Sequence, residues 1–127
     1  DTEPLATFEP MVRALFGKQP VEYVWGIAMT ETTNIPAAVP TVMIDNDRTR
    51  VTEWRFAPGA ATGWHRHEMD YVVVPVMDGT LKIVDKNGTE NLAKLKDGIP
   101  YFRDIGVEHD VINANDYEFA FVEIEFK

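Results

Sequence analysis

Three histidines, His65, His67 and His109, are the residues of this sequence whose type and spacing best suit chemistry. Side chains alternate between the two faces of an extended strand, so His65 and His67, two positions apart, would share one face. His109 comes much later in the chain and can join them only if the fold closes strands back over one another. Three neutral imidazoles suit a first-row divalent metal ion and leave positions open for a further ligand.

Short strand candidates separated by turn residues fill the chain from Thr41 onwards. Asn87-Gly88, between two such candidates, is the strongest hairpin signal. Many short strands at near-regular spacing favour a sandwich, jelly roll or barrel over an α/β fold, so we expect an all-β domain. The candidates cover residues 42–44, 50–56, 71–77, 81–84, 89–95, 101–103, 107–112 and 118–126.

Residues 1–28 form a prelude to the predicted β domain, which we expect to span residues 29–127. Between Thr7 and Gly17, apolar residues recur at the three-and-four spacing of one helix face and predict a short amphipathic helix. Residues 21–25 are rich in strand formers and could add an edge strand. The prelude would cover one mouth of the domain, pack outside its sheet or exchange with a partner subunit.

Two linked motifs resemble those of the cupin superfamily. The first runs from Gly59 through the two neighbouring histidines to Tyr71, where the family has a glutamate, and the segment that follows is one residue longer than usual. In the second, Asp104 replaces the family's proline, and the matching residues are Gly98, Gly106, His109 and Asn113. The resemblance covers about residues 41–127 and is greatest to short single-domain bacterial cupins, some of them associated with β-alanine degradation.

This resemblance implies a double-stranded β-helix, also called a jelly-roll barrel, with a short N-terminal helix before it. It also implies one divalent metal ion held by His65, His67 and His109, while the replacement of the family's glutamate ligand leaves the fourth position open. Imidazole accepts Fe, Mn, Zn and Ni alike, so the sequence does not identify the metal.

Tyr71 is the candidate catalytic residue. If the strand from His65 is unbroken, the odd-numbered residues from 65 to 71 share one face and Asp70 points away. A buried tyrosine usually donates a hydrogen bond, which is the role we expect, and the alternative is a tyrosinate ligand of the metal. Three further polar residues on candidate strands are candidates for substrate binding, and strand parity does not choose among them: Tyr101, Arg103 and Glu123.

Composition narrows the partners. The net charge of −9 argues against binding to nucleic acid or to an anionic membrane surface. The chain has no cysteine, which excludes disulfides and thiolate ligands and fits a cytoplasmic location. A metal held only by neutral histidines keeps its positive charge and favours a small anionic ligand. Unpaired strand edges and the prelude further predict a homodimer.

We therefore predict a metalloenzyme that acts on a small anionic metabolite bound at a three-histidine site. Two chemistries remain open within this hypothesis. A redox-active metal would support a dioxygenase, whereas a redox-inert metal would act as a Lewis acid in isomerase, decarboxylase or lyase chemistry. The alternative is a non-catalytic cupin that binds or senses a small ligand.

Overall fold

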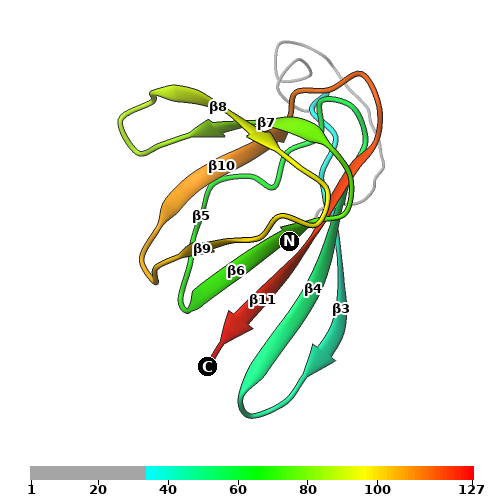
Figure 1. Ribbon diagram of the computed structural model, residues 1–127. Helices are drawn as coiled ribbons and strands as arrows, with labels where there is room; N and C mark the ends of the chain where they lie inside the picture. Colours follow the sequence, from blue (N-terminus) through cyan, green and yellow to red (C-terminus); the bar gives the residue numbers. More distant parts are fainter. Residues whose placement is uncertain (1–33) are drawn as a thin grey trace, which may run out of the picture. The chain divides into compact units, whose positions relative to one another are not determined.

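The structure is a computed structural model that describes residues 34–127, of which Ala37–Lys127 form one compact unit (Figure 1). The helix and edge strand predicted within residues 1–28, and the boundary predicted between residues 28 and 29, lie outside the described residues. The strands of the described part are β3 (Val39–Asp45), β4 (Thr49–Phe56), β5 (His65–Arg66), β6 (Asp70–Pro75), β7 (Gly79–Val84), β8 (Glu90–Leu95), β9 (Tyr101–Arg103), β10 (Glu108–Asn113) and β11 (Phe119–Phe126).

These strands form two antiparallel sheets that face each other in Figure 1. One sheet has the order β5-β10-β7-β8 and the other the order β3-β4-β11-β6-β9. From β4 onwards the chain crosses to the other sheet after every strand except β7, which is the winding of a double-stranded β-helix. The predicted all-β jelly roll is confirmed. Within residues 34–127, no helix is both long enough and apolar enough to cross a membrane.

The inner face of the five-stranded sheet is apolar at one end. Phe56 pairs with Phe119, the next rung pairs Trp54 with Phe121, and the rings of Phe56 and Phe121 lie 5.6 Å apart. All three phenylalanines are buried and the partly buried Trp54 packs against them, so these four side chains form part of the hydrophobic core. Burial of each such ring stabilises the fold by about 2–3 kcal/mol. This end of the sandwich is therefore closed.

Asn113, at the end of β10, joins several segments of the chain. Its Nδ2 donates to the carbonyl oxygens of Phe56, Ala57 and Tyr117 at 3.2, 3.2 and 2.9 Å. The side chain is 2% exposed, so these bonds replace water that cannot reach it. This residue of the second motif thus holds the start of the segment that leads to β5 against β10.

Candidate metal centre

The structure brings the three histidines together. Their Nε2 atoms converge, with 3.1 Å between those of His65 and His67 and 3.1 Å between those of His67 and His109. Nitrogen ligands at about 2.1 Å from one ion lie about 3.0 Å apart in octahedral and about 3.4 Å apart in tetrahedral geometry. The spacing and chemistry of these donors therefore fit a divalent metal ion.

Antiparallel pairing of β5 with β10 sets this arrangement, because it places His65 directly opposite His109. His67 lies just beyond β5, yet its N–H donates to Val107 O and its carbonyl accepts from Gly106 N, both at 2.8 Å. Gly106 has a φ of 96°, a conformation that glycine adopts without strain. The glycine before β10 therefore allows the turn that keeps His67 beside His109.

His65 is held in the tautomer that a metal ligand needs. Its Nδ1 lies 2.8 Å from the carbonyl oxygen of Gly63 and donates to it, so Nε2 keeps a free lone pair. Gly63 has a φ of 84°, and its N–H donates to Asp110 Oδ1 at 3.0 Å. Asp110, which follows His109 in the sequence, therefore fixes the loop that orients His65.

His67 is enclosed by groups of the five-stranded sheet. The ring of Tyr71 stacks on it, with centroids 3.8 Å apart and planes 15° apart. On the Nδ1 side, Glu123 Oε2 lies 3.7 Å away, and the Trp54 indole N–H donates to Glu123 Oε1 at 3.1 Å. Both His67 and Glu123 are buried. His67 is therefore fixed on its ring face and on the edge opposite the candidate metal position.

Burial keeps the histidines neutral, which is their metal-binding form. Burial, followed by the neighbouring imidazoles, lowers the pKa of His67 to about 2. Burial also lowers the pKa of His109 to about 3, with smaller contributions from His65 and Arg103. The pKa of His65 is lowered too, again mainly by burial. A metal ion would thus meet three unprotonated imidazoles at neutral pH.

Burial shifts the pKa of Glu123 in the opposite direction, upward. Desolvation, and then the charge of Glu125, raises the pKa of its carboxyl group to about 7, against the lowering effect of the Trp54 hydrogen bond. A cation on the neighbouring histidines would lower that pKa again, because opposite charges stabilise each other.

The strand from His65 is broken before Tyr71, so the condition under which the odd-numbered residues from 65 to 71 would share one strand face is not met. β5 and β6 belong to different sheets, and the chain crosses between the sheets from His67 to Asp70. Tyr71 nevertheless lies beside His67, because β6 packs on the inner side of the site. Asp70 is turned to the loop before β10, where its Oδ1 accepts the Ile105 N–H at 2.7 Å.

The hydroxyl group of Tyr71 lacks a partner. It is buried, and no hydrogen bond to it occurs among the described residues, which differs from the bonded hydroxyl usual for a buried tyrosine. Burial raises the pKa of this phenol further above its ordinary value. Tyr71 therefore keeps its proton and has a donor available, which fits a bound anion beside the histidines better than a tyrosinate ligand.

A polar row lies on the inner face of the five-stranded sheet at the end opposite the phenylalanines. Strand pairing places its members directly opposite one another, in the order Arg103, Tyr71, Glu125, Arg50 and Asp45. Arg50 is 3.8 Å from Glu125 and 3.5 Å from Asp45. Arg103 extends over the ring of Tyr101, 5.1 Å from its centroid. Of the predicted substrate-binding residues, Arg103 thus belongs to this row and Tyr101 lies next to it, whereas Glu123 faces His67.

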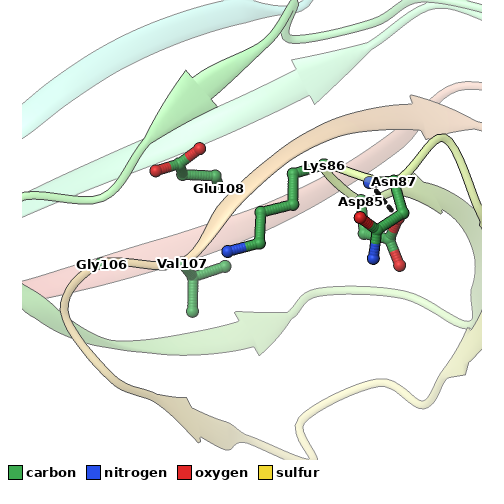
Figure 2. A pocket seen from close by; sticks show the side chains of 6 residues that line it. All are labelled: Asp85, Lys86, Asn87, Gly106, Val107 and Glu108. Carbon is green, nitrogen blue, oxygen red and sulfur yellow. Dashed lines mark hydrogen bonds between the residues drawn. The ribbon is translucent and has the colours of Figure 1, made fainter.

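A separate depression of about 270 Å³ lies away from the histidines (Figure 2). The depression is lined by Asp85, Lys86, Asn87 and Gly106–Glu108. The Lys86 amino group points toward Val107 and Glu108. Glu108 precedes His109 on β10, so its side chain points to the opposite face of the sheet. The Glu108 carboxylate lies 3.6 Å from the Arg66 guanidinium, and Arg66 also pairs with the exposed Glu68, at 3.3 Å.

Two residues of the site were not identified from the sequence as parts of it. One is Trp54, which packs against the core and whose indole N–H also donates to Glu123 Oε1. The partner lies 69 positions away, and only the pairing of β4 with β11 brings the two together. The second residue is Asp110, which accepts the Gly63 N–H. Its position next to His109 in the sequence could have indicated a role in the site.

Comparison with known proteins agrees with this fold. The chain is 59% identical over 92 residues to the "Beta-alanine degradation protein BauB" of Pseudomonas aeruginosa. The aligned residues cover 72% of this chain and 96% of that protein. A crystal structure of a cupin domain from Bordetella pertussis is 56% identical, with a TM-score of 0.72, and covers 74% of this chain and 97% of that one.

A more distant structure shows the fold alone. It is a conserved Klebsiella pneumoniae protein with a double-stranded β-helix domain, 21% identical, with a TM-score of 0.59, covering 69% of this chain and 75% of that one. No family model matches the chain. The high identity to two proteins that it covers almost fully, together with the shared jelly roll, identifies the family. This chain belongs to the cupin superfamily and is a small bacterial cupin.

Proposed function

We propose that this cupin is a metalloenzyme that acts on a small anionic metabolite at one divalent metal ion held by His65, His67 and His109. The convergence of three Nε2 atoms, 3.1 Å apart in two pairs, is the observation that carries the proposal. The lowered pKa values of these histidines support it, because the ligands need not lose protons before they bind. The ion would supply positive charge and open coordination positions, for either dioxygen or Lewis-acid chemistry.

The residues around the histidines favour an anionic ligand. Arg103 stands directly opposite Tyr71 on the neighbouring strand, and the side chains of such pairs come within about 5 Å of each other. Among residues 34–127, no carboxylate lies within ion-pair distance of Arg103, so its charge is available to a ligand. We assign Arg103 and Tyr101 to ligand binding, and Tyr71 to donation of a hydrogen bond to the bound anion.

The name of the Pseudomonas relative refers to β-alanine degradation. β-Alanine and the products expected from its breakdown carry a carboxylate, which agrees with the positive charges of the ion and of Arg103. We therefore propose a small carboxylate as the substrate class. The choice between a dioxygenase and an isomerase, decarboxylase or lyase depends on the native metal.

A non-catalytic binding cupin is the second candidate. It is favoured by the carboxylates beside the histidines, because each is already engaged: Glu123 by Trp54 and His67, and Asp110 by the N–H of Gly63. A general acid or base for a reaction would then have to be Tyr71 or a group of the substrate.

The metal content of protein purified without added metal, followed by assays with small carboxylates, separates these candidates. The enzyme hypothesis predicts about one metal ion per chain and carboxylate-dependent turnover or oxygen consumption. Stoichiometric metal with ligand binding but no turnover would favour the binding protein. Protein that takes up none of the candidate metals would contradict the metal-site proposal itself.

We also propose a homodimer that packs through the outer face of the five-stranded sheet. One uncharged row crosses all five strands there: Ile44, Val51, Ile124, Val72 and Phe102. Its two ends are 50% and 52% exposed. A two-fold axis at the central strand would stack this row on its copy, and the face, roughly 24 Å by 20 Å or about 480 Å² in projection, has the size of a small interface, below the ~800 Å² per partner of a standard one. A cytoplasmic location is proposed with it, supported by the absence of cysteine.

A further inference from the structure

We propose that Glu123 is the positioning residue of the metal centre, and that it selects the tautomer of His67 that presents Nε2 to the ion. This inference rests on the proposed metal site. Trp54 helps to position Glu123, because its indole N–H donates to Glu123 Oε1 and leaves Oε2 facing His67.

The geometry around His67 gives Glu123 this role. The Nδ1 atom of His67 lies 3.7 Å from Glu123 Oε2, while its Nε2 lies 3.1 Å from the Nε2 atoms of both other histidines. At 3.7 Å the carboxylate acts mainly through its charge, which attracts a proton on Nδ1 and repels a lone pair there. The favoured tautomer carries its proton on Nδ1 and leaves Nε2 free for a metal ion.

The three histidines are therefore oriented by different groups. His65 donates from Nδ1 to a backbone carbonyl, that of Gly63. His67 faces a buried carboxylate instead, and the stacked ring of Tyr71 prevents it from turning away. In this chain the buried carboxylate beside the site thus lies behind a ligand, while the position of the family's usual glutamate carries a phenol.

Glu123→Gln tests this inference because its effect has a definite direction. An amide that accepts the Trp54 N–H through its oxygen must turn its NH₂ group toward His67 Nδ1. That nitrogen then has to accept, so the proton moves to Nε2 and blocks metal binding. Trp54→Phe in the same chain frees the amide to flip, so the double variant should regain the Nδ1–H tautomer.

Nitrogen-15 NMR of the imidazoles at pH 8 in the metal-free protein reads the tautomers directly, and the chain has only three histidines to assign. We expect His67 to change tautomer in Glu123→Gln, and the affinity for Zn²⁺ to fall about 10- to 100-fold. The Trp54→Phe/Glu123→Gln double variant should recover part of that affinity. Glu53→Gln, the same chemical change next to Trp54 on the opposite face, should alter neither property.

The inference is overturned if wild-type protein binds Zn²⁺ and Glu123→Gln retains both the His67 tautomer and the affinity. It is also overturned if the affinity falls with no change of tautomer, because Glu123 would then be only a structural residue. If the wild type itself binds no metal, the proposed function fails, while the tautomer measurement still decides whether Glu123 orients His67.

Discussion

The ring of Tyr71 stacks on the ring of His67, with centroids 3.8 Å apart and planes 15° apart. This contact puts a neutral phenol where the cupin pattern has a negatively charged glutamate. An ion on the three histidines would keep its full positive charge, and the buried hydroxyl of Tyr71, which has no partner among residues 34–127, would donate to an acceptor on a bound ligand. Charge and hydrogen bonding in this pocket both favour an anion.

Replacement of His67 by alanine should remove the metal and leave the fold. Two remaining imidazoles hold a divalent ion poorly, so we expect the affinity to fall about 100-fold or more. Elemental analysis measures the metal, and circular dichroism measures the fold. Glu68→Ala, at the exposed neighbouring position, is the control and should keep the metal. Stoichiometric metal in His67→Ala would show that this histidine is not a ligand.

Replacement of Tyr71 by phenylalanine should have opposite effects on stability and on ligand binding. The hydroxyl is buried and has no hydrogen-bond partner in the described part of the chain, so its removal should stabilise the metal-free protein by roughly 1 kcal/mol. Loss of a donor to a bound anion should weaken carboxylate binding about tenfold, with metal affinity unchanged. Urea unfolding and calorimetry measure these quantities. Reduced metal retention in Tyr71→Phe would instead support the tyrosinate role.

Asn113 should contribute more to stability than to chemistry. Asn113→Ala removes the hydrogen bonds that its Nδ2 donates to three carbonyls, of which that of Ala57 keeps the N–H of Ala60 as a second partner. We expect a loss of about 3 kcal/mol or more in the free energy of unfolding, measured with urea. Asn87→Ala, in an exposed hairpin turn, is a control with a smaller expected loss. An equally stable Asn113→Ala protein would mean that water replaces these bonds.

The local pattern predicted the strands well because turn residues and strand formers alternate over short distances. The motif spacing also identified the three histidines that converge. Strand parity failed between His67 and Tyr71, because it assumes one continuous strand and the chain changes sheets there. The Trp54–Glu123 contact could not be predicted from the sequence, for a different reason. It depends on which distant strands pair, and the local pattern does not contain that choice.

The stability of the metal-free protein should decrease as the pH falls below about 6.5. In the unfolded chain the histidines titrate near 6.5, whereas in the folded protein His67 and His109 stay neutral down to about 2 and 3. The unfolded state therefore binds more protons in this range. Glu123 opposes the trend between about 7 and 4.5, because its pKa is raised in the folded state to about 7.

For the groups with the largest shifts, two histidines against one carboxyl group leave an excess of about one proton, equivalent to roughly 1.4 kcal/mol of lost stability per pH unit between pH 6.5 and 4.5. Urea unfolding with a chelator at pH 7, 6 and 5 measures this slope. Glu123→Gln removes the opposing contribution and should make the slope steeper. Stability that is constant or higher at pH 5 would contradict the burial of neutral histidines.

Charged substitutions in the outer apolar row should separate the proposed dimer. Ile44 and Phe102 form the exposed ends of the row, and a two-fold axis would bring each against the other's copy. Two glutamates, introduced as Ile44→Glu and Phe102→Glu, would be buried without partners in that interface. We expect sedimentation at micromolar concentration to change from dimer to monomer while the circular dichroism spectrum stays the same.

Leu92→Glu is the matched control for this prediction. Leu92 is 69% exposed on β8 and belongs to the other sheet, so the same apolar-to-acidic change there should leave the dimer intact. If the wild type sediments as a monomer, the chain does not dimerise under these conditions. If the Ile44→Glu and Phe102→Glu variants remain dimeric, the two copies meet on another surface. The outer face is the interface only if the Ile44 and Phe102 changes alone release the monomer.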